Sequence, residues 1–285
     1  MTTTCLEPRT ATGPAAVASH RCEVLEHRSV NSRYRYLRLR ARADLAGMTR
    51  PGQFYQLRCP TTAALHPFLL RPMSVYGTGP EPGCIEFLYN VTGVGTSALA
   101  TLEVGASMDI VGPVGNTFSF SPSFSRVLVV ARGVGLATMA PLVQAAGRAG
   151  VAVTALMSAR SPGDLMQQEF LRGVPAEVHS VFDSDGSSAV ENVDSLVRAL
   201  IEQQRPDVVY TCGSHRLLML LQRVLADYPE VAGEVAMEQR MACGMGVCLS
   251  CVRLFDTPDG KQFKRVCREG PVFPIHEVVG EVEFG

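Results

Sequence analysis

The sequence has almost no net charge, no run of basic residues and no long apolar run. Its 285 residues carry a formal net charge of −1 at pH 7, a balance that favours neither nucleic acid nor a membrane surface as a partner. No apolar stretch reaches the length of a transmembrane helix, and residues 1–20 lack the apolar centre of a secretory signal. We therefore expect a cytoplasmic protein with a flexible N-terminal arm over 1–20.

Metal-ligand spacing is also absent from the six histidines. Cysteine, by contrast, is plentiful. Nine are present, and five of them are scattered singly, at Cys5, Cys22, Cys59, Cys84 and Cys212. This usage suits a reducing compartment, where clustered thiols are more often metal or redox ligands than structural disulfides. The clustered cysteines are therefore the first candidates for chemistry.

The remaining four cysteines lie near the C-terminus, at Cys243, Cys248, Cys251 and Cys267. The first three are spaced C-x4-C-x2-C, which is the plant-type spacing of a [2Fe–2S] cluster with a nearer fourth ligand. Gly244 and Gly246 allow the backbone to wrap closely around the sulfurs. A structural zinc site usually takes two separated pairs of ligands. The spacing favours a [2Fe–2S] cluster, with zinc and a redox dithiol as alternatives.

The chain divides into two regions with different patterns of apolar residues. Up to about Gly115, short β-branched or aromatic runs separated by turn residues predict a small antiparallel barrel, with strands at 22–30, 34–41, 53–59, 70–77, 84–92 and 107–115. After residue 125, apolar strands alternate with helical stretches near 137–149, 163–172, 188–204 and 214–228. That alternation predicts a doubly wound parallel α/β sheet. The Ser/Pro-rich stretch 118–125 marks the boundary between the two.

In this order, the parts resemble the electron-transfer subunits of dihydroorotate dehydrogenase, within the ferredoxin–NADP reductase-like superfamily. The resemblance rests on "RPMSVYG" (71–77), "YNVTGVGTSAL" (89–99), "VYTCGS" (209–214) and "CGMGVCLSC…VCREGPVF" (243–273). It covers nearly the whole chain beyond residue 20. The implied domains are an FAD-binding β-barrel over 21–122, an NAD(P)-binding α/β domain over 123–235 and a [2Fe–2S] module over 236–285.

The barrel carries the expected FAD residues. Arg71 can neutralise a flavin pyrophosphate, and the glycines before a short helix leave bare N–H groups for a phosphate. The resemblance implies FAD contacts from Arg71, Pro72, Met73, Ser74, Leu88, Tyr89, Asn90, Gly93, Gly95 and Thr96. The alternative for "RPMS" is an edge strand whose arginine binds nothing.

The expected nucleotide site departs from the family pattern. Arg132 stands where the glycine-rich turn usually has its first glycine, so it either obstructs the nicotinamide or pairs with a phosphate. The second α/β strand ends without a carboxylate for an NAD ribose, whereas Ser158 and Arg160 could bind a 2′-phosphate. NADH and NADPH both stay open, with the resemblance favouring NADH. The expected NAD(P) residues are Gly133, Gly135, Arg160, Cys212 and Gly213.

Two of these features have simpler interpretations. Cys212 could be a buried cysteine at a strand end rather than a residue that faces the nicotinamide. The loop "FDSDGSS" (182–188) echoes an acidic loop of the family, and it could equally be a solvated turn.

The resemblance implies an NAD(P)H-dependent FAD/[2Fe–2S] oxidoreductase component. A hydride passes from NAD(P)H to FAD, and electrons leave singly through the cluster to a catalytic, FMN-containing flavoprotein in a hetero-oligomer. No general acid or base is required, because the cofactors carry the chemistry. The alternatives are a stand-alone NAD(P)H–ferredoxin-type reductase for diffusible acceptors and a cluster-bearing adaptor without turnover.

Apolar residues are interleaved with the cluster cysteines, at Met241, Met245, Val247 and Leu249. Their simplest role is to pack around the cluster and keep it dry. Any that are exposed would contact the partner, and Met245, between two glycines at the tip of the loop, is the best candidate.

Overall fold

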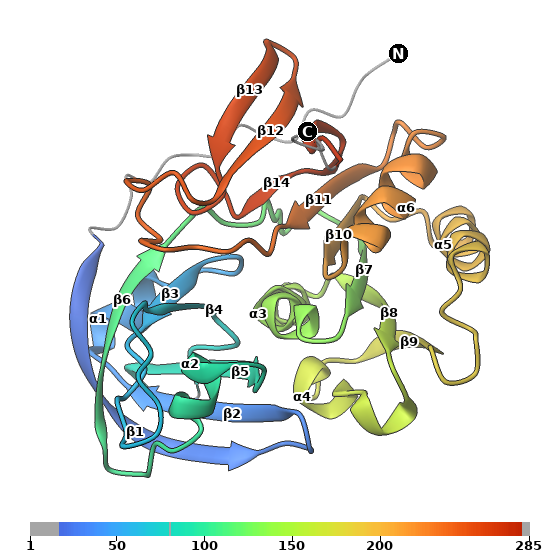
Figure 1. The fold of residues 1–285 in the computed structure, drawn as a ribbon. Coiled ribbons are helices and arrows are strands. Elements are labelled where there is room, and N and C mark those ends of the chain that lie inside the picture. Colours follow the sequence, from blue (N-terminus) through green and yellow to red (C-terminus); the bar gives the residue numbers. More distant parts are fainter. Residues whose placement is uncertain (1–16, 80, 281–285) are drawn as a thin grey trace.

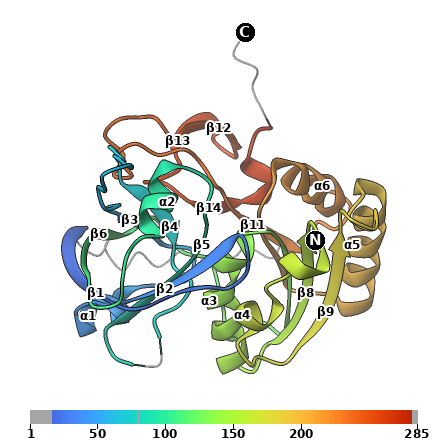
Figure 2. The same ribbon diagram turned by 60° about the horizontal axis from the view of Figure 1, so that its bottom comes forward.

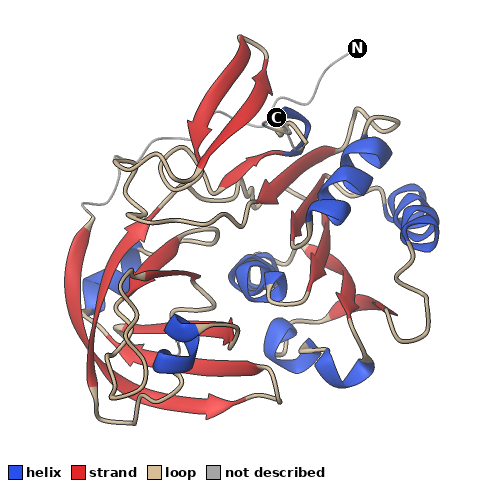
Figure 3. Ribbon diagram, in the orientation of Figure 1, coloured by secondary structure: helices blue, strands red, loops and turns tan. Residues whose placement is uncertain are grey.

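A computed structural model describes residues 17–79 and 81–280. It contains two six-stranded sheets and one two-stranded sheet. Strands dominate the first half of the chain, and most of the helices lie against the second sheet (Figures 1 and 3). The predicted order of an antiparallel barrel, a parallel α/β domain and a small C-terminal module is confirmed. Most of the predicted arm, residues 1–16, lies outside the described residues.

The first sheet is a nearly closed antiparallel barrel in the order β4-β3-β6-β1-β2-β5. An isolated bridge between Gly77 and Glu86 joins its two ends. Alternate side chains point inward, as the period of a strand requires; Tyr55 and Leu57 of β3 belong to the barrel core, whereas Phe54 packs outside it. The elements are β1 (Ala18–Ser29), β2 (Tyr34–Arg40), α1 (Ala43–Met48), β3 (Phe54–Leu57), β4 (Arg71–Ser74), β5 (Cys84–Asn90), α2 (Val94–Leu99) and β6 (Ser107–Val114).

The second sheet has the order β14-β11-β10-β7-β8-β9 and is parallel except for β14. Helices α3 and α4 cover the face toward the barrel, and α5 and α6 cover the other (Figure 2). Its elements are β7 (Arg126–Arg132), α3 (Gly135–Arg148), β8 (Ala152–Ala159), η1 (Pro162–Asp164), α4 (Gln167–Leu171), β9 (Ala176–Phe182), α5 (Val190–Gln204), β10 (Val208–Cys212), α6 (His215–Leu225) and β11 (Ala232–Ala236).

The C-terminal module consists of a long loop, the hairpin of β12 (Val252–Thr257) and β13 (Gly260–Arg265), strand β14 (Val272–Pro274) and η2 (Ile275–Glu277). Strand β14 pairs antiparallel with β11, so the module extends the α/β sheet. Phe255 and Phe273 pack in the same core as α5 and α6. None of the helices in the described residues is both long enough and apolar enough to cross a bilayer.

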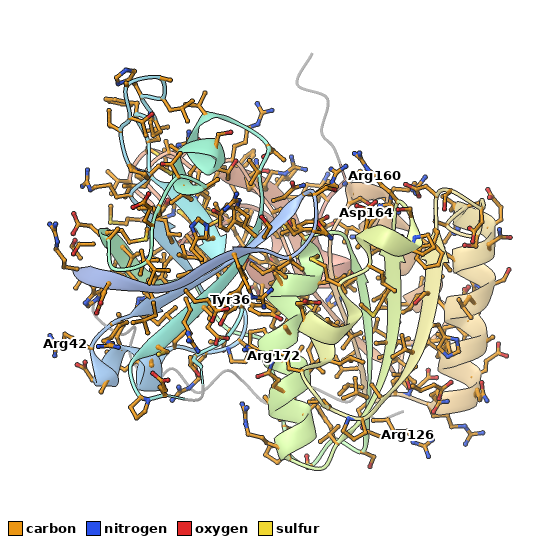
Figure 4. All side chains as sticks on the ribbon, turned by 90° about the horizontal axis from the view of Figure 1, so that it is seen from below. Tyr36, Arg42, Arg126, Arg160, Asp164 and Arg172 are labelled. Atoms are coloured by element: carbon orange, nitrogen blue, oxygen red, sulfur yellow. The ribbon has the colours of Figure 1, made fainter. Side chains whose placement is uncertain are left out.

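A buried carboxylate joins the barrel to the α/β domain. Glu86 of β5 is fully buried, accepts a hydrogen bond from Tyr36 Oη at 2.8 Å and forms an ion pair with Arg172. The Arg172 guanidinium lies 4.9 Å from the ring centroid of Tyr76. Figure 4 shows Tyr36 and Arg172 at this junction. A buried charge is tolerated only when it is paired, so these contacts fix the two domains against each other.

Candidate flavin, nucleotide and cluster site

A cavity of about 340 Å³, which we call the flavin cavity after the predicted FAD residues on its wall, opens between the barrel, α3 and the start of the C-terminal loop. Seven of the ten predicted FAD residues line it: Pro72, Met73, Ser74, Leu88, Tyr89, Asn90 and Thr96. Phe54, Val134, Thr138, Glu238, Met241 and Pro271 complete much of the wall. The volume lies within the range of small-molecule sites. The cavity therefore touches all three parts of the chain, including segments close to the cluster cysteines.

The other three predicted FAD residues lie together at the start of α2. The Arg71 guanidinium packs over Gly95 so closely that a Cβ atom there would lie 2.7 Å from Arg71 Cζ. Arg71 Nη1 also donates to the carbonyls of Leu69, at 2.5 Å, and Leu70, at 3.2 Å. Thr96 Oγ1 accepts the N–H of Gly93 at 3.1 Å and so fixes the turn. A positive charge held over a bare backbone fits a phosphate group.

Tyr89 is positioned by a histidine that the sequence patterns did not single out. His27 Nε2 lies 2.9 Å from Tyr89 Oη, and His27 Nδ1 lies 2.8 Å from the Leu102 carbonyl oxygen. Burial lowers the pKa of His27 and outweighs the opposite effect of the Leu102 carbonyl. A neutral imidazole with one N–H and one lone pair can satisfy both partners.

A second cavity, of about 290 Å³, lies at the carboxyl ends of β7, β8 and β10, and we call it the nucleotide cavity after the predicted NAD(P) residues on its wall. The predicted residues Gly133, Arg160 and Gly213 line it. Gly135 lies behind it, where a Cβ atom would overlap the carbonyl oxygen of Cys212, so its lack of a side chain lets α3 approach β10. Ligands of open α/β sheets bind at this edge, where the strand order reverses.

Arg132 does not bring a free charge into this cavity. Its Nη1 donates to Ser158 Oγ at 2.7 Å, and its Nη2 contacts Asp183 Oδ2 at 2.6 Å. Hydrogen bonds from Arg132 and Ser188 lower the pKa of Asp183 to about 2. The loop 182–188 therefore supplies the carboxylate that pairs with Arg132. Ser158, a candidate for contacting a 2′-phosphate, already accepts a hydrogen bond from Arg132.

A carboxylate also lines the nucleotide cavity, although the sequence at the end of β8, the second strand of the α/β domain, predicts no carboxylate for an NAD ribose. Asp164 of η1 lies beside Arg160 at this edge, whereas Arg126 lies at the opposite end of the sheet (Figure 4). Asp164 comes five residues after β8 ends, and its Oδ2 accepts a hydrogen bond from Ser161 Oγ at 3.0 Å. The sequence did not reveal this carboxylate, because Asp164 belongs to a 3-10 turn, η1, that brings it back to the strand end.

Glu238 lines both the flavin cavity and the nucleotide cavity. Burial raises the pKa of its carboxyl group. Cys212 Sγ lies 4.0 Å from Glu238 Oε1, and burial, reinforced by Glu238, raises the pKa of this thiol. Cys212 is thus both a buried strand-end cysteine and a neighbour of the site. Glu238 was not predicted; its signal is an acidic residue two positions after an apolar strand.

The four clustered cysteines lie as two pairs. Cys251 Sγ and Cys267 Sγ are 3.2 Å apart and buried, whereas Cys243 is half-buried and Cys248 is exposed. Cys243 Sγ accepts the backbone N–H of Met245 at 3.4 Å and that of Cys248 at 3.5 Å. In the described residues no three His, Cys, Asp or Glu side chains converge as ligands of one metal ion. Two thiols per iron is the arrangement that a [2Fe–2S] cluster needs.

Cys243 and Cys267 differ in acidity. Burial acts to raise the pKa of Cys243, but hydrogen bonds from the Cys248 and Met245 N–H groups prevail and lower it to about 6. Burial and the neighbouring Cys251 raise the pKa of Cys267 to about 12. The thiolate, not the thiol, binds metals, and the thiolate of Cys243 forms at lower pH than that of Cys267.

The cluster loop has the conformation that its glycines allow. Gly244 and Gly246 have φ angles of +68° and +83°, as expected for a tight wrap. Arg265 Nη1 donates to the Gly246 carbonyl oxygen at 3.0 Å and holds the loop from the hairpin side. The exposed fractions are 44% for Met245, 81% for Val247 and 59% for Leu249. These three side chains, which we call the apolar tip, face solvent, whereas Met241 lines the flavin cavity.

Comparison with known families agrees with a cluster-binding module at the C-terminus of a longer electron-transfer chain. Residues 238–279 match the iron–sulfur cluster binding domain of dihydroorotate dehydrogenase B. The chain is 32% identical over 238 residues to the electron transfer subunit of dihydroorotate dehydrogenase B (NAD(+)) from Desulforamulus reducens, covering 84% of this chain and 90% of that protein. It is 34% identical to the corresponding Enterococcus faecalis subunit, covering 81% and 88%.

Solved structures show the same fold. The NADH-dependent reduced ferredoxin–NADP oxidoreductase superposes with a TM-score of 0.75 at 25% identity, covering 91% of this chain and 90% of that one. A ferredoxin reductase of carbazole 1,9a-dioxygenase gives a TM-score of 0.61 at 20% identity, covering 76% and 69%.

Proposed function

Because the chain belongs to the family of dihydroorotate dehydrogenase B electron transfer subunits, we propose that it carries electrons between a nicotinamide nucleotide and a catalytic flavoprotein subunit. Bound FAD and a bound [2Fe–2S] cluster would supply the conversion of a hydride into single electrons. The observation that carries the proposal is the 340 Å³ cavity, whose wall is shared by the barrel, the α/β domain and the segment leading to the cluster cysteines.

The barrel residues would bind and orient FAD. Arg71, over Gly95, would hold the pyrophosphate, and β4 and β5 would present Ser74 and Tyr89 to the ring system. His27 holds Tyr89 in place through the hydrogen bond to its hydroxyl. Together these contacts would keep the flavin between the nucleotide edge and the cluster loop.

The α/β domain would bind the nucleotide, for which we propose NADH. The expected contacts are Gly133, Gly135, Arg160, Cys212 and Gly213, which the fold brings to one sheet edge. Asp164 supports NADH, since a carboxylate near the second strand suits a ribose diol and repels a 2′-phosphate. Arg132, neutralised by Asp183, would shape this edge rather than bind phosphate.

The cluster would be held by Cys243, Cys248, Cys251 and Cys267, two thiolates to each iron. The apolar tip supports docking of a partner at this loop, because exposed apolar groups gathered at one place mark interaction surfaces. We propose that the partner is the catalytic subunit, which contains FMN, in a cytoplasmic hetero-oligomer.

An anaerobic reconstitution tests the function. The purified chain should contain about two irons and one FAD, oxidise NADH faster than NADPH with an artificial acceptor, and, mixed with the catalytic subunit, form NADH from NAD(+) when dihydroorotate is added. Rapid reduction of small carriers but no complex would indicate a stand-alone reductase. No nucleotide turnover despite bound FAD would refute the enzyme function and leave an adaptor. Stoichiometric zinc without iron–sulfur absorption would refute the cluster.

A further inference from the structure

Gln56 is a buried amide with no partner. It lies on β3, and both of its side-chain atoms, Nε2 and Oε1, are buried without a hydrogen bond to any described residue. Its exposed fraction is 0%. Leaving a buried donor or acceptor unpaired is destabilising, so a glutamine at this position needs an explanation.

The amide is aimed at the cluster loop. The backbone of Gly244 packs directly on the Gln56 side chain: a Cβ atom at Gly244 would overlap Gln56 Nε2 and lie 2.7 Å from Gln56 Cδ. Gly244 follows Cys243, and its φ of +68° turns the loop over the amide. The residue that packs on this amide is therefore the one next to a proposed iron ligand.

The same residue adjoins the proposed flavin strand. Gln56 pairs in register with Pro72 of β4, and the preceding pair is Tyr55 with Met73. Pro72 and Met73 both line the flavin cavity. Gln56 thus lies between the strand expected to contact the flavin and the loop expected to contact the cluster.

We infer that the Gln56 side-chain amide donates a hydrogen bond to a sulfur of the cluster and thereby raises the cluster's reduction potential. The inference rests on the proposed function, because it requires the cluster. Sulfurs of an iron–sulfur cluster accept N–H groups, and such hydrogen bonds help set the potential. The reduced cluster carries one more negative charge than the oxidised one, so a donor stabilises the reduced form more.

The test replaces the donor and keeps the shape. Methionine is unbranched, apolar and similar in size to glutamine, and it cannot donate a hydrogen bond. The matched control is Gln144→Met on α3, because Gln144 Nε2 is also buried without a partner in the described residues but belongs to the nucleotide domain. The full chain with FAD bound is titrated anaerobically, and the reduced cluster is followed by electron paramagnetic resonance.

We expect Gln56→Met to keep its iron and FAD but to shift the midpoint potential downward, approaching a tenfold lower ratio of reduced to oxidised cluster at fixed potential, or about 59 mV for one electron. The flavin potential and the Gln144→Met protein should be unchanged. An unchanged cluster potential in iron-replete Gln56→Met protein overturns the inference, and wild-type protein without iron overturns the proposed function instead.

If Gln56→Met loses the cluster, its potential cannot be measured, and the inference is tested in the wild-type chain instead. There, glutamine side-chain amides are labelled with 15N, and the reduced cluster is examined for a hyperfine coupling to that nitrogen. A coupling that persists in Gln144→Met protein supports the hydrogen bond, whereas its absence from the wild-type spectrum overturns it.

Discussion

A single methyl group added at Gly95 should weaken FAD binding without weakening the fold. Gly95 is the second residue of α2 and has an ordinary helical φ, so alanine fits its backbone. In a helix interior alanine is preferred over glycine by about 0.8–1 kcal/mol. Near a helix start we expect less, so the free energy of unfolding should stay equal or rise slightly.

The cost falls on Arg71. The new methyl would lie 2.7 Å from Arg71 Cζ, so the guanidinium must leave its place over the turn. A hydrogen bond to a charged group contributes about 1.5–3 kcal/mol. Losing the one proposed to reach the FAD pyrophosphate should raise the dissociation constant about 10- to 150-fold.

The assay is FAD titration of the apo-flavoprotein, alongside thermal unfolding. Gly47→Ala on α1 is the matched control, because its Cβ would meet nothing within 4 Å and Gly47 is not among the expected FAD residues, so it should bind FAD like the wild type. Arg71→Ala should match Gly95→Ala, and the double variant should be no worse than either single variant, because both changes remove one contact. Wild-type affinity in Gly95→Ala, or additive losses in the double variant, would refute the reasoning.

Four further outcomes are expected. Cys248→Ser should lose its iron, measured by visible absorption, yet keep FAD, since the flavin residues lie in the barrel; loss of both would contradict separate sites. Arg132→Gly should raise the KM for nucleotide at unchanged FAD content, and unaltered nucleotide kinetics would place Arg132 outside the site. Met245→Glu should weaken binding of the catalytic subunit at least about tenfold by burying an unpaired charge, with NADH-to-dye activity intact; an unaffected complex would place docking elsewhere. Because burial raises the pKa of Glu238 above its ordinary value of 4.5, the wild type should lose stability as the pH rises from that value to the folded-state pKa. Glu238→Gln should not show this decline in thermal melts, and identical pH profiles of the two proteins would contradict the raised pKa.

Local patterns were sufficient to predict most of the architecture. Each predicted barrel strand and α/β helix has a counterpart, because period-2 and period-3.6 patterns report burial within one element. The cysteine spacing also predicted that one loop would carry three thiols, and the structure brings Cys267 to the last of them, Cys251. The hairpin of β12 and β13 escaped prediction: β13 is largely exposed and offers no alternating apolar face.

The rest of the site depends on packing between distant segments. Glu238 and Asp164 each follow a strand by a few residues, but only the tertiary fold directs them into a cavity. The sequence around Gln56 indicates only a polar residue in a strand. The role proposed for it depends on its contact with Gly244, which lies nearly two hundred residues later in the sequence. No single-element pattern contains that information.

Strand β14 has a consequence for building chimeric redox proteins. It follows Cys267 by five residues and pairs with β11 at the edge of the nucleotide sheet, and Asn116, just beyond the barrel, bonds the Val272 backbone through both amide atoms at 2.9 Å. A transplant cut at residue 236 would strip one sheet of its last strand and leave the graft with an unpaired edge that invites aggregation. The exchangeable unit therefore begins near residue 125, so a designer who wants this cluster must also take the nucleotide domain and rebuild the seam with the new barrel.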